Sequence, residues 1–340
     1  MDRVAPKPPM HDDRTRIGHV PPEKLTERVT DVGDVLELSS MGIPDLSSQN
    51  WTLEITGLVD RPARISFEEL TRLPKQTVQS VFVCSGDPRR PTVPLRRVAN
   101  VKWGGADLAD LLDRAGIRPG ATHLWSYGLD HGKFLGVFPQ PHYVKDMPLS
   151  RLRDGSVLVA YELNDVPLTP KNGFPARLVV PGFYGTNCVK WLCRLELRER
   201  RASNFMTTRL YNDPDFNADP SGETTRPLWA VAPESIIVAP TANAVIAHAP
   251  TEIWGWAWSS CAVQMVEVSV DGGGRWVDSE LERPDGLSWQ RFSCRWQPPG
   301  AGTFELRCRA TDVNGRIQPS DGARNAVYSI RVTVEDDSRR

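Results

Sequence analysis

The residue with the clearest capacity for chemistry is Cys84, which stands in the run V-F-V-C-S-G-D-P-R-R over residues 81–90. A thiol at the mouth of a buried strand, followed by Arg89 and Arg90, is suited to be a soft metal ligand or a nucleophile, because the guanidinium groups favour the thiolate. A buried structural cysteine, packed as a small hydrophobe, explains the run equally well. The run alone therefore leaves both interpretations open.

A second segment with chemical potential is N-G-F-P-A-R-L-V-V-P-G-F-Y-G-T-N-C-V-K-W-L, residues 172–192. Arg177 opens a near-continuous apolar strand, where a charge needs an anionic partner such as a phosphate. Lys190 follows a glycine-rich turn whose backbone N–H groups are able to hold a polar ligand. The alternative is a structural ion pair between Arg177 and Asp165 or Glu162.

A third segment, T-T-R-L-Y-N over residues 207–212, carries Arg209 and Tyr211. In an extended chain these two side chains would point to the same side, since side chains alternate along a strand. A plain solvated loop is the alternative.

Bulk composition excludes several classes of protein. The chain has 340 residues and a net charge of −1, which gives no argument for nucleic-acid binding. No apolar stretch is long enough to span a membrane, and no P-loop, G-x-S-x-G or H-E-x-x-H motif occurs. The six cysteines lack zinc spacing, and no C-x-x-C-H motif for covalent haem is present. We therefore expect a cytoplasmic protein with free thiols and a separate electron partner.

The periodicity of the chain predicts an α+β domain over residues 49–200, after an extended N-terminal arm over residues 1–48. Ser66 and Glu69 form a capping box for a short helix, and Leu108, Leu111 and Leu112 mark an amphipathic helix that stops at Gly116. The predicted strands cover residues 51–57, 78–83, 122–127, 157–163, 176–180 and 190–197.

The C-terminal part has an all-β pattern. Residues 201–235 form a connector, and short alternating runs over residues 236–337 predict an immunoglobulin-like sandwich. The expected strands include residues 252–258, 264–270, 290–296, 303–310 and 326–334. Of the tryptophans in this part, Trp256 is expected in the core, whereas Trp254 and Trp258 fit the core or an interface.

Taken together, these segments resemble the sulfite oxidase family of molybdenum–pterin (molybdopterin, Moco) oxidoreductases, over about residues 45–337. The family's C-x-G-N-R-R run corresponds to C-S-G-D-P-R-R here. Its cofactor-holding stretch corresponds to Y-E-L-N and L-T-P-K-N-G-F-P-A-R onward, within residues 161–192. The segments W-G-W-A-W-S-S, V-E-V-S-V-D-G-G and W-Q-P-P-G resemble the family's C-terminal dimerisation domain.

The resemblance implies roles for individual residues. Cys84 would ligate molybdenum beside the pterin. The residues that match positions holding the pterin and its phosphate are Asp130, Asn172, Arg177, Val189 and Lys190. The residues that match the wall of an oxyanion substrate pocket are Arg90, Trp103 and Tyr211. The implied reaction is oxygen-atom transfer at molybdenum, with electrons passed to a separate acceptor such as a cytochrome.

The chain also departs from the family pattern. The family's F-x-R-N-H stretch becomes L-S-S-M-G-I-P, which puts Ser40 in place of a substrate-binding arginine, and the late W-N-x-R-G segment is missing. Asn172 replaces a histidine, and Asp87 and Pro88 replace the asparagine of the cysteine run. These departures affect substrate choice more than cofactor binding.

The leading hypothesis is a molybdenum-dependent oxidoreductase that acts on a small sulfur compound such as sulfite and pairs as a homodimer through its C-terminal domain. The alternatives are a reductase of the same fold, acting on a sulfoxide or another oxyanion, and a non-catalytic binding module that keeps the fold.

Overall fold

The computed structural model describes residues 8–11, 16–17, 20–86, 97–134, 136–215, 218–219, 221, 223–320 and 324–336. This part is mostly β-structure with two short α-helices. The chain divides into two compact units whose segments alternate along the sequence. Unit 1 comprises Met1–Ile17, Glu37–Val78 and Lys102–Trp229, and unit 2 comprises Gly18–Leu36, Gln79–Val101 and Ala230–Arg340.

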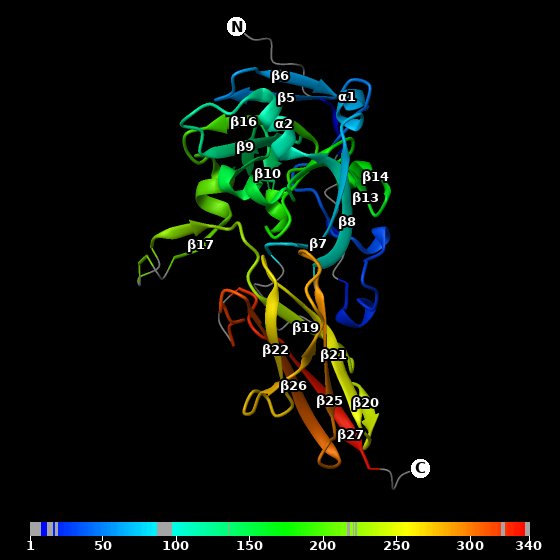
Figure 1. The fold of residues 1–340 in the computed structure, drawn as a ribbon. Coiled ribbons are helices and arrows are strands. Elements are labelled where there is room, and N and C mark those ends of the chain that lie inside the picture. Colours follow the sequence, from blue (N-terminus) through cyan, green and yellow to red (C-terminus); the bar gives the residue numbers. More distant parts are fainter. Residues whose placement is uncertain are drawn as a thin grey trace. The chain divides into compact units, whose positions relative to one another are not determined.

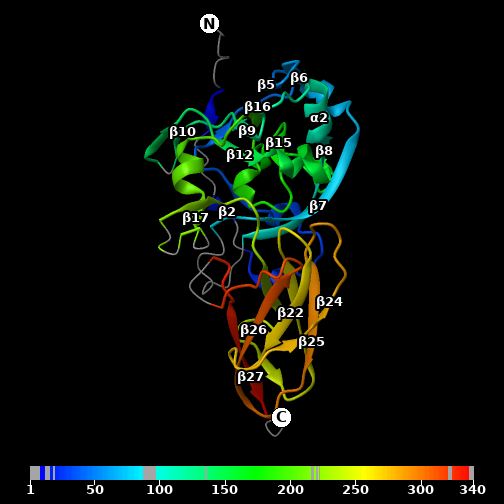
Figure 2. The ribbon, with the colours of Figure 1, turned by 60° about the vertical axis from the view of Figure 1, so that its left-hand side comes forward.

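The main sheet of unit 1 has five strands in the order β12-β9-β16-β5-β6 (Figure 1, Figure 2). Strand β16 pairs parallel with β5, while the other neighbours are antiparallel. Alternation in β5 buries Leu53 and Ile55 completely, as its period-two pattern predicts. The strand bounds are β5 Thr52–Gly57, β6 Ala63–Ser66, β9 His123–Gly128, β12 Val144–Pro148 and β16 Leu192–Arg198.

Both predicted helices of unit 1 are confirmed. The helix α1 (Phe67–Thr71) begins with the expected capping box, in which Ser66 and Glu69 satisfy each other's backbone N–H groups. The helix α2 (Leu108–Ala115) buries one apolar face and ends at Gly116, which takes a φ of 74°. The Asp107 carboxylate accepts hydrogen bonds from two N–H groups of its first turn. At the C-terminal end of α2, the Asp60 N–H donates to the Gly116 carbonyl at 2.8 Å and so fixes the position of the helix.

A second sheet has the order β14-β13-β8-β7, and β15 pairs with β13. It positions the segment around Arg177, because β13 pairs Ala160 with Arg177 and also pairs with β8. The bounds are β7 Lys75–Val83, β8 Val98–Asp107, β13 Leu158–Leu163, β14 Val166–Pro167 and β15 Arg177–Val179.

Short elements complete unit 1. The two-stranded pairs are β1 (Met10–His11) with β4 (Ile43–Pro44), β2 (Arg16–Ile17) with β3 (Glu37–Leu38), β10 (Gly132–Phe134) with β11 (Phe138–Gln140), and β17 (Asn212–Pro214) with β18 (Thr225–Pro227). The helical turns are η4 Leu149–Asp154, η5 Pro170–Asn172, η6 Gly185–Asn187 and η7 Met206–Leu210.

Unit 2 is built on two sheets (Figure 2). One apolar core lies between them. Core side chains come from both sheets and include Ile253, Phe292 and Leu306, all fully buried. One sheet has the order β19 (Glu234–Ala239), β21 (Thr251–Trp258), β25 (Gln290–Trp296), β24 (Glu280–Leu281). The other has the order β20 (Val245–Ala247), β27 (Ser329–Glu335), β26 (Gly302–Asp312), β22 (Val263–Ser269), β23 (Val277–Asp278). The N-terminal segment adds the turns η1 (Pro22–Lys24) and η2 (Val32–Asp34) to this unit.

The tryptophans of β21 divide between core and surface. Trp256 is buried, as expected, and stacks on Trp289 with ring centroids 4.8 Å apart. Trp258 is also buried, whereas Trp254 is partly exposed and lies against Arg291. Among the described residues, no helix has the length and hydropathy that a transmembrane span requires.

Candidate cofactor and anion site

Unit 1 brings together the five residues expected to hold a pterin. Asn172 closes η5, Arg177 opens β15, and Val189 with Lys190 lies between η6 and β16. Asp130 follows directly after β9. Backbone pairing joins the two halves of the segment, since the Leu178 N–H donates to the Val189 carbonyl at 2.8 Å. The structure thus places these residues in one neighbourhood.

Arg177 is a buried cation that the backbone holds in place. Its Nη1 and Nη2 donate to the carbonyls of Asn172 and Cys188, each at 3.0 Å. Its guanidinium carbon lies 4.8 Å from the ring centroid of Trp103, which is itself buried. Burial lowers the pKa of Arg177 to about 10, so the group stays charged at neutral pH. The neighbourhood of Asn172 and Cys188 therefore contains a buried positive charge.

The two carboxylates considered as ion-pair partners of Arg177 bind lysines instead. Glu162 accepts from Lys75 Nζ at 2.6 Å, and Asp165 accepts from Lys102 Nζ at 3.4 Å. The structural ion pair predicted as the alternative is therefore wrong. Arg177 instead donates hydrogen bonds to two neutral backbone carbonyls.

Lys190 adds a second, partly buried cation. Its Nζ donates to the Lys171 carbonyl at 2.8 Å and to Ser39 Oγ at 3.2 Å, and it lies 4.3 Å from the ring centroid of Trp191. Gly173 makes this packing possible, because a Cβ there would lie 3.0 Å from Lys190 Cβ and its φ is +103°. Burial, and then the charge of Arg177, lowers the pKa of Lys190 to about 7.

Asp130 is the acidic member of this neighbourhood. Burial raises its pKa to about 7, and the charge of Lys190 opposes that rise. Gly128, at the end of β9, lets the Asp130 carboxyl and the Lys190 carbonyl pack closely against the backbone. A Cβ at this position would lie 2.4 Å from Asp130 Oδ1 and 2.8 Å from the Lys190 carbonyl oxygen. Burial and the charge of Arg177 lower the pKa of Lys190 more than Asp130 and Glu37 raise it, so an anion bound here would stabilise the ammonium form.

The segment that carries Tyr211 is not extended. Residues Met206–Leu210 form the π-helical turn η7, so the expectation that Arg209 and Tyr211 lie in an extended chain and point to the same side is wrong. The physical reason is local: Asn204 Oδ1 accepts from the N–H groups of Met206 and Thr207, which starts a helical turn. Tyr211 follows this turn and packs against the apolar cluster of Met41, Phe134 and Met206.

Two residues beside Tyr211 were not singled out from the sequence. Lys145 Nζ lies 4.7 Å from the Tyr211 ring centroid, and the Tyr143 hydroxyl is hydrogen-bonded to Thr186 and to Tyr211. Burial raises the pKa of Tyr143 well above its usual value, so this hydroxyl stays protonated. The only sequence signal is the short alternating run H-Y-V-K-D-M-P, which predicts a strand but not the burial of its lysine.

Cys84 belongs to unit 2, at the end of β7, and is 9% exposed. Its N–H donates to the Arg97 carbonyl at 3.0 Å, and its Sγ accepts from the Gly86 N–H at 3.4 Å. The Ser85 carbonyl accepts from Arg324, a contact that the sequence did not predict. Arg90 lies outside the described residues, as do Asp87 and Pro88.

Other cysteines are less suited to bind a metal. Burial raises the pKa of Cys188 and raises that of Cys193 to about 12, so both are neutral thiols. Within the described ranges, no three His, Cys, Asp or Glu side chains gather as a metal site. A metal bound through one thiolate and an organic cofactor does not need such a cluster.

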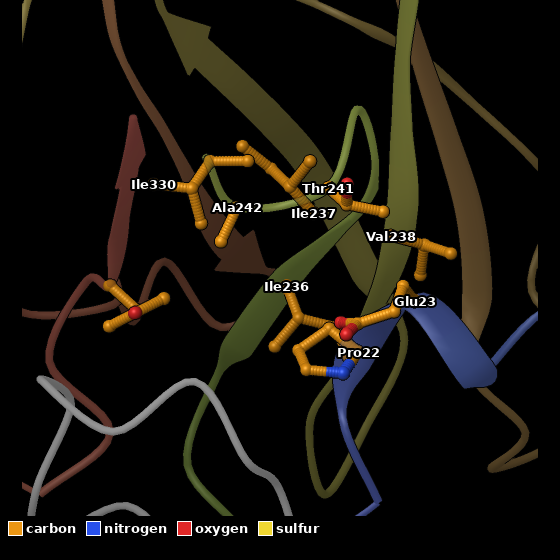
Figure 3. Close-up of a pocket in the computed structure, with 9 residues that line it drawn as sticks. Pro22, Glu23, Ile236, Ile237, Val238, Thr241, Ala242 and Ile330 are labelled. Atoms are coloured by element: carbon orange, nitrogen blue, oxygen red, sulfur yellow. The ribbon is translucent and has the colours of Figure 1, made fainter. Parts of the chain in front are cut away.

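A small pocket in unit 2 does not suit an anion (Figure 3). It lies between η1 and β19, where aliphatic side chains such as Ile236 and Val238 line it and Glu23 adds a negative charge. Its nine described lining residues include no cation and no thiol. The cationic site of unit 1 is therefore the better candidate for cofactor chemistry.

Comparison with known protein families agrees with this choice. The family described as "Oxidoreductase molybdopterin binding domain" matches residues 40–206, and the family described as "Mo-co oxidoreductase dimerisation domain" matches residues 226–334. The first match contains Cys84 and all five residues of the cationic neighbourhood. The chain thus consists of the two domains of this class, a molybdopterin-binding oxidoreductase domain followed by a Mo-co oxidoreductase dimerisation domain.

Individual relatives narrow the class. The chain is 30% identical to mitochondrial sulfite oxidase of Mus musculus, over 92% of this chain and 61% of that protein. It is 28% identical to nitrate reductase [NADH] 2 of Phaseolus vulgaris, over 82% of this chain and 36% of that protein. The crystal structure of the sulfane dehydrogenase SoxCD from Paracoccus pantotrophus matches with a TM-score of 0.79 and 27% identity, over 92% of this chain and 82% of that chain. The chain belongs to the sulfite oxidase family of molybdopterin oxidoreductases.

Proposed function

We propose that this protein is a molybdenum-dependent oxidoreductase that carries out oxygen-atom transfer on a small sulfur compound such as sulfite and passes electrons to a separate acceptor. The observation that carries the proposal is the buried Arg177 with the partly buried Lys190 beside it, inside the segment that matches the molybdopterin-binding domain. The names of the mouse and Paracoccus relatives both refer to oxidation of sulfur compounds.

The residues of unit 1 fit a phosphorylated pterin. Arg177 and Lys190 lie within electrostatic reach of each other, and burial, followed by the charge of Arg177, lowers the pKa of Lys190, so a bound phosphate would favour the charged form of Lys190. In this proposal Arg177 and Lys190 bind the phosphate, while Asp130, Asn172 and Val189 bind the polar edges of the pterin. Removing water from Arg177 strengthens its attraction to that phosphate.

Cys84 is proposed as the protein's ligand to molybdenum. A thiolate is the soft donor that the metal prefers, and the buried end of β7 holds Cys84 through its own N–H. When bound, the molybdenum cofactor supplies two-electron redox chemistry and the oxygen atom that is transferred. The chain's part is to hold the cofactor, to bind the oxyanion through Arg90, Trp103 and Tyr211, and to exclude bulk water.

A second candidate is reduction of an oxyanion or a sulfoxide on the same site. The similarity to a nitrate reductase supports it, because that relative's name refers to the reduction of an oxyanion. Ser40 and the missing W-N-x-R-G segment reduce the positive charge available for sulfite, which favours a different substrate. The two candidates share cofactor and site and differ in the direction of electron flow.

The organisation of the chain completes the proposal. We propose that residues 49–200 bind the cofactor, that residues 201–235 connect the domains, and that residues 236–337 form an immunoglobulin-like domain that pairs two copies of the chain. The dimerisation family that matches residues 226–334 supports the homodimer. A cytochrome is proposed as electron acceptor. The six free thiols support a reducing compartment such as the cytoplasm.

Steady-state oxidation of sulfite tests this function. The purified protein is mixed with sulfite and an artificial one-electron acceptor, and Cys84→Ser is compared with the matched control Cys261→Ser. We expect turnover in the wild type and in the control and none in Cys84→Ser. Reduction of nitrate or a sulfoxide from a reduced dye, with no oxidation of sulfite, would favour the second candidate. Activity in Cys84→Ser equal to wild type would contradict both.

A further inference from the structure

Lys145 is a buried lysine that the proposed function leaves without a role. It lies on β12, and the whole residue is only 1% exposed. Lys145 pairs with the buried Ser126 on the neighbouring strand β9. Ser126 also pairs with Leu195 on the next strand, β16. Lysine is almost never fully buried unless it has a partner.

The nearest carboxylate does not serve as that partner. Asp146 follows Lys145 on the strand, so its side chain points to the opposite face of the sheet. It accepts from Arg201 Nε at 2.9 Å and from the Ala202 N–H at 3.1 Å, which engages it fully on that face. Among the described residues none accepts a hydrogen bond from Lys145 Nζ, and the Nζ lies over the Tyr211 ring, 4.7 Å from its centroid.

This arrangement leaves donors unused. An ammonium group has three N–H donors, and a ring beneath it engages one side only. Burial lowers the pKa of Lys145 to about 7, with Asp146 opposing and Arg201 assisting that change. A bound anion would reverse the effect, because an opposite charge favours the ammonium form.

The surroundings place Lys145 beside the proposed reaction site. Tyr211 is the residue expected in the oxyanion pocket, and Tyr143 is hydrogen-bonded to it. The charge of Asp130 also acts on Tyr143, which links this corner to the cofactor residues. We propose that Lys145 is an additional oxyanion-binding residue, whose ammonium group binds one or two oxygens of a small substrate against the Tyr211 ring.

This inference rests on the proposed function only in placing Tyr211 at the substrate pocket, and its test uses sulfate, which binds without turnover. Calorimetric titration of the purified holoenzyme with sulfate is compared between wild type, Lys145→Met, Lys145→Arg and the control Lys133→Met, whose lysine is exposed on β10. We expect at least tenfold weaker binding in Lys145→Met, partial recovery in Lys145→Arg, and binding within twofold of wild type in the control.

Several outcomes would overturn the proposal. Equal sulfate affinity in wild type and folded Lys145→Met would do so, and so would wild-type protein that binds no sulfate at millimolar concentration. If Lys145→Met and a second variant, Lys145→Gln, both fail to fold, the lysine is a structural residue and the proposal is wrong. With sulfite as substrate, we expect KM to rise in Lys145→Met far more than kcat falls. Sulfate binding through Lys145 without any sulfite oxidation would refute the proposed function and leave this inference standing.

Discussion

Replacing Arg177 by methionine separates a role in holding the cofactor from a role in holding the fold. The substitution keeps an unbranched side chain of similar length and removes the charge. It also removes two hydrogen bonds, to the carbonyls of Asn172 and Cys188, and the contact with Trp103. The two roles predict different effects on protein with and without cofactor.

In cofactor-free protein the gains and losses nearly cancel. Burial lowers the pKa of Arg177 from 12.5 to about 10, which corresponds to about 3 kcal/mol against keeping the charge inside. Two hydrogen bonds from a charged donor contribute about 1.5–3 kcal/mol each, or about 3–6 kcal/mol together. We therefore expect Arg177→Met to lose only about 0–3 kcal/mol in the free energy of unfolding.

The cofactor-bound protein should lose much more. Removing one partner of a buried ion pair costs about 3–5 kcal/mol, because the remaining charge is left uncompensated. A loss of that size weakens binding by at least about a hundredfold, at about 1.4 kcal/mol per factor of ten. The stabilisation that bound cofactor gives to the fold should fall by the same amount.

The assay measures pterin content and thermal unfolding of protein made in hosts with and without the pathway that makes the cofactor. The matched control is Arg309→Met, since Arg309 also lies over an indole ring, 4.3 Å from the Trp276 centroid, but is paired with Glu267 in unit 2. We expect Arg177→Met to lose its pterin and Arg309→Met to keep it. If Arg177→Met keeps its pterin, or if both forms of the protein lose equal stability, the reasoning is refuted.

Further predictions concern the neighbouring groups. In cofactor-free protein, Asp130→Asn should unfold at a higher urea concentration than wild type at pH 8 and equally at about pH 4. Burial raises the pKa of Asp130 from 3.8 to about 7, so between these values the fold binds more protons than the unfolded chain and the stability of wild type falls as the pH rises. A lower midpoint of the variant at pH 8 would contradict this. Gly128→Ala should lose molybdenum, because the new Cβ would clash with Asp130 and with the carbonyl of Lys190. The control Gly300→Ala has open space around its new Cβ and should keep its molybdenum. Equal molybdenum content in the two variants would refute the account. Burial lowers the pKa of Lys145 from 10.5 to about 7, so between these values the unfolded chain binds more protons than the fold and the free energy of unfolding should rise with pH. In urea unfolding, the free energy of unfolding of wild type should rise by about 2 kcal/mol more than that of Lys145→Met between pH 7 and 9. An equal pH dependence in the two proteins would contradict this.

Local signals in the sequence predicted most of the regular elements. The capping box at Ser66 and the helix that ends at Gly116 depend on residues within a few positions of each other, so both could be read from the chain alone. The alternating strands of unit 2 were predicted for the same reason. The extended form expected for Tyr211 was wrong because Asn204 starts a helical turn, and nothing in the hydrophobic period indicates that turn.

The candidate site could be predicted only in part, because its energetics depend on groups distant in the sequence. The apolar run around Arg177 indicated a buried charge, but not that backbone carbonyls would hold it. Lys145 stands in a run of mixed polarity, and its burial follows from the pairing of β12 with β9, from the turns η6 and η7 that pack against β12 and from the position of Tyr211. The contact of Arg324 with the Ser85 carbonyl joins segments 239 positions apart, which no local pattern reveals.

The central claim, that this chain binds a molybdenum cofactor through Cys84, is tested most directly by molybdenum per chain. Elemental mass spectrometry is applied to wild type, Cys84→Ser and Cys261→Ser, each made in a host that supplies the pterin cofactor. The account predicts about one molybdenum atom per chain in wild type and in Cys261→Ser, with the metal lost or its spectrum changed in Cys84→Ser. A folded wild-type protein without molybdenum, or a Cys84→Ser variant with the same content and the same spectrum, would contradict it.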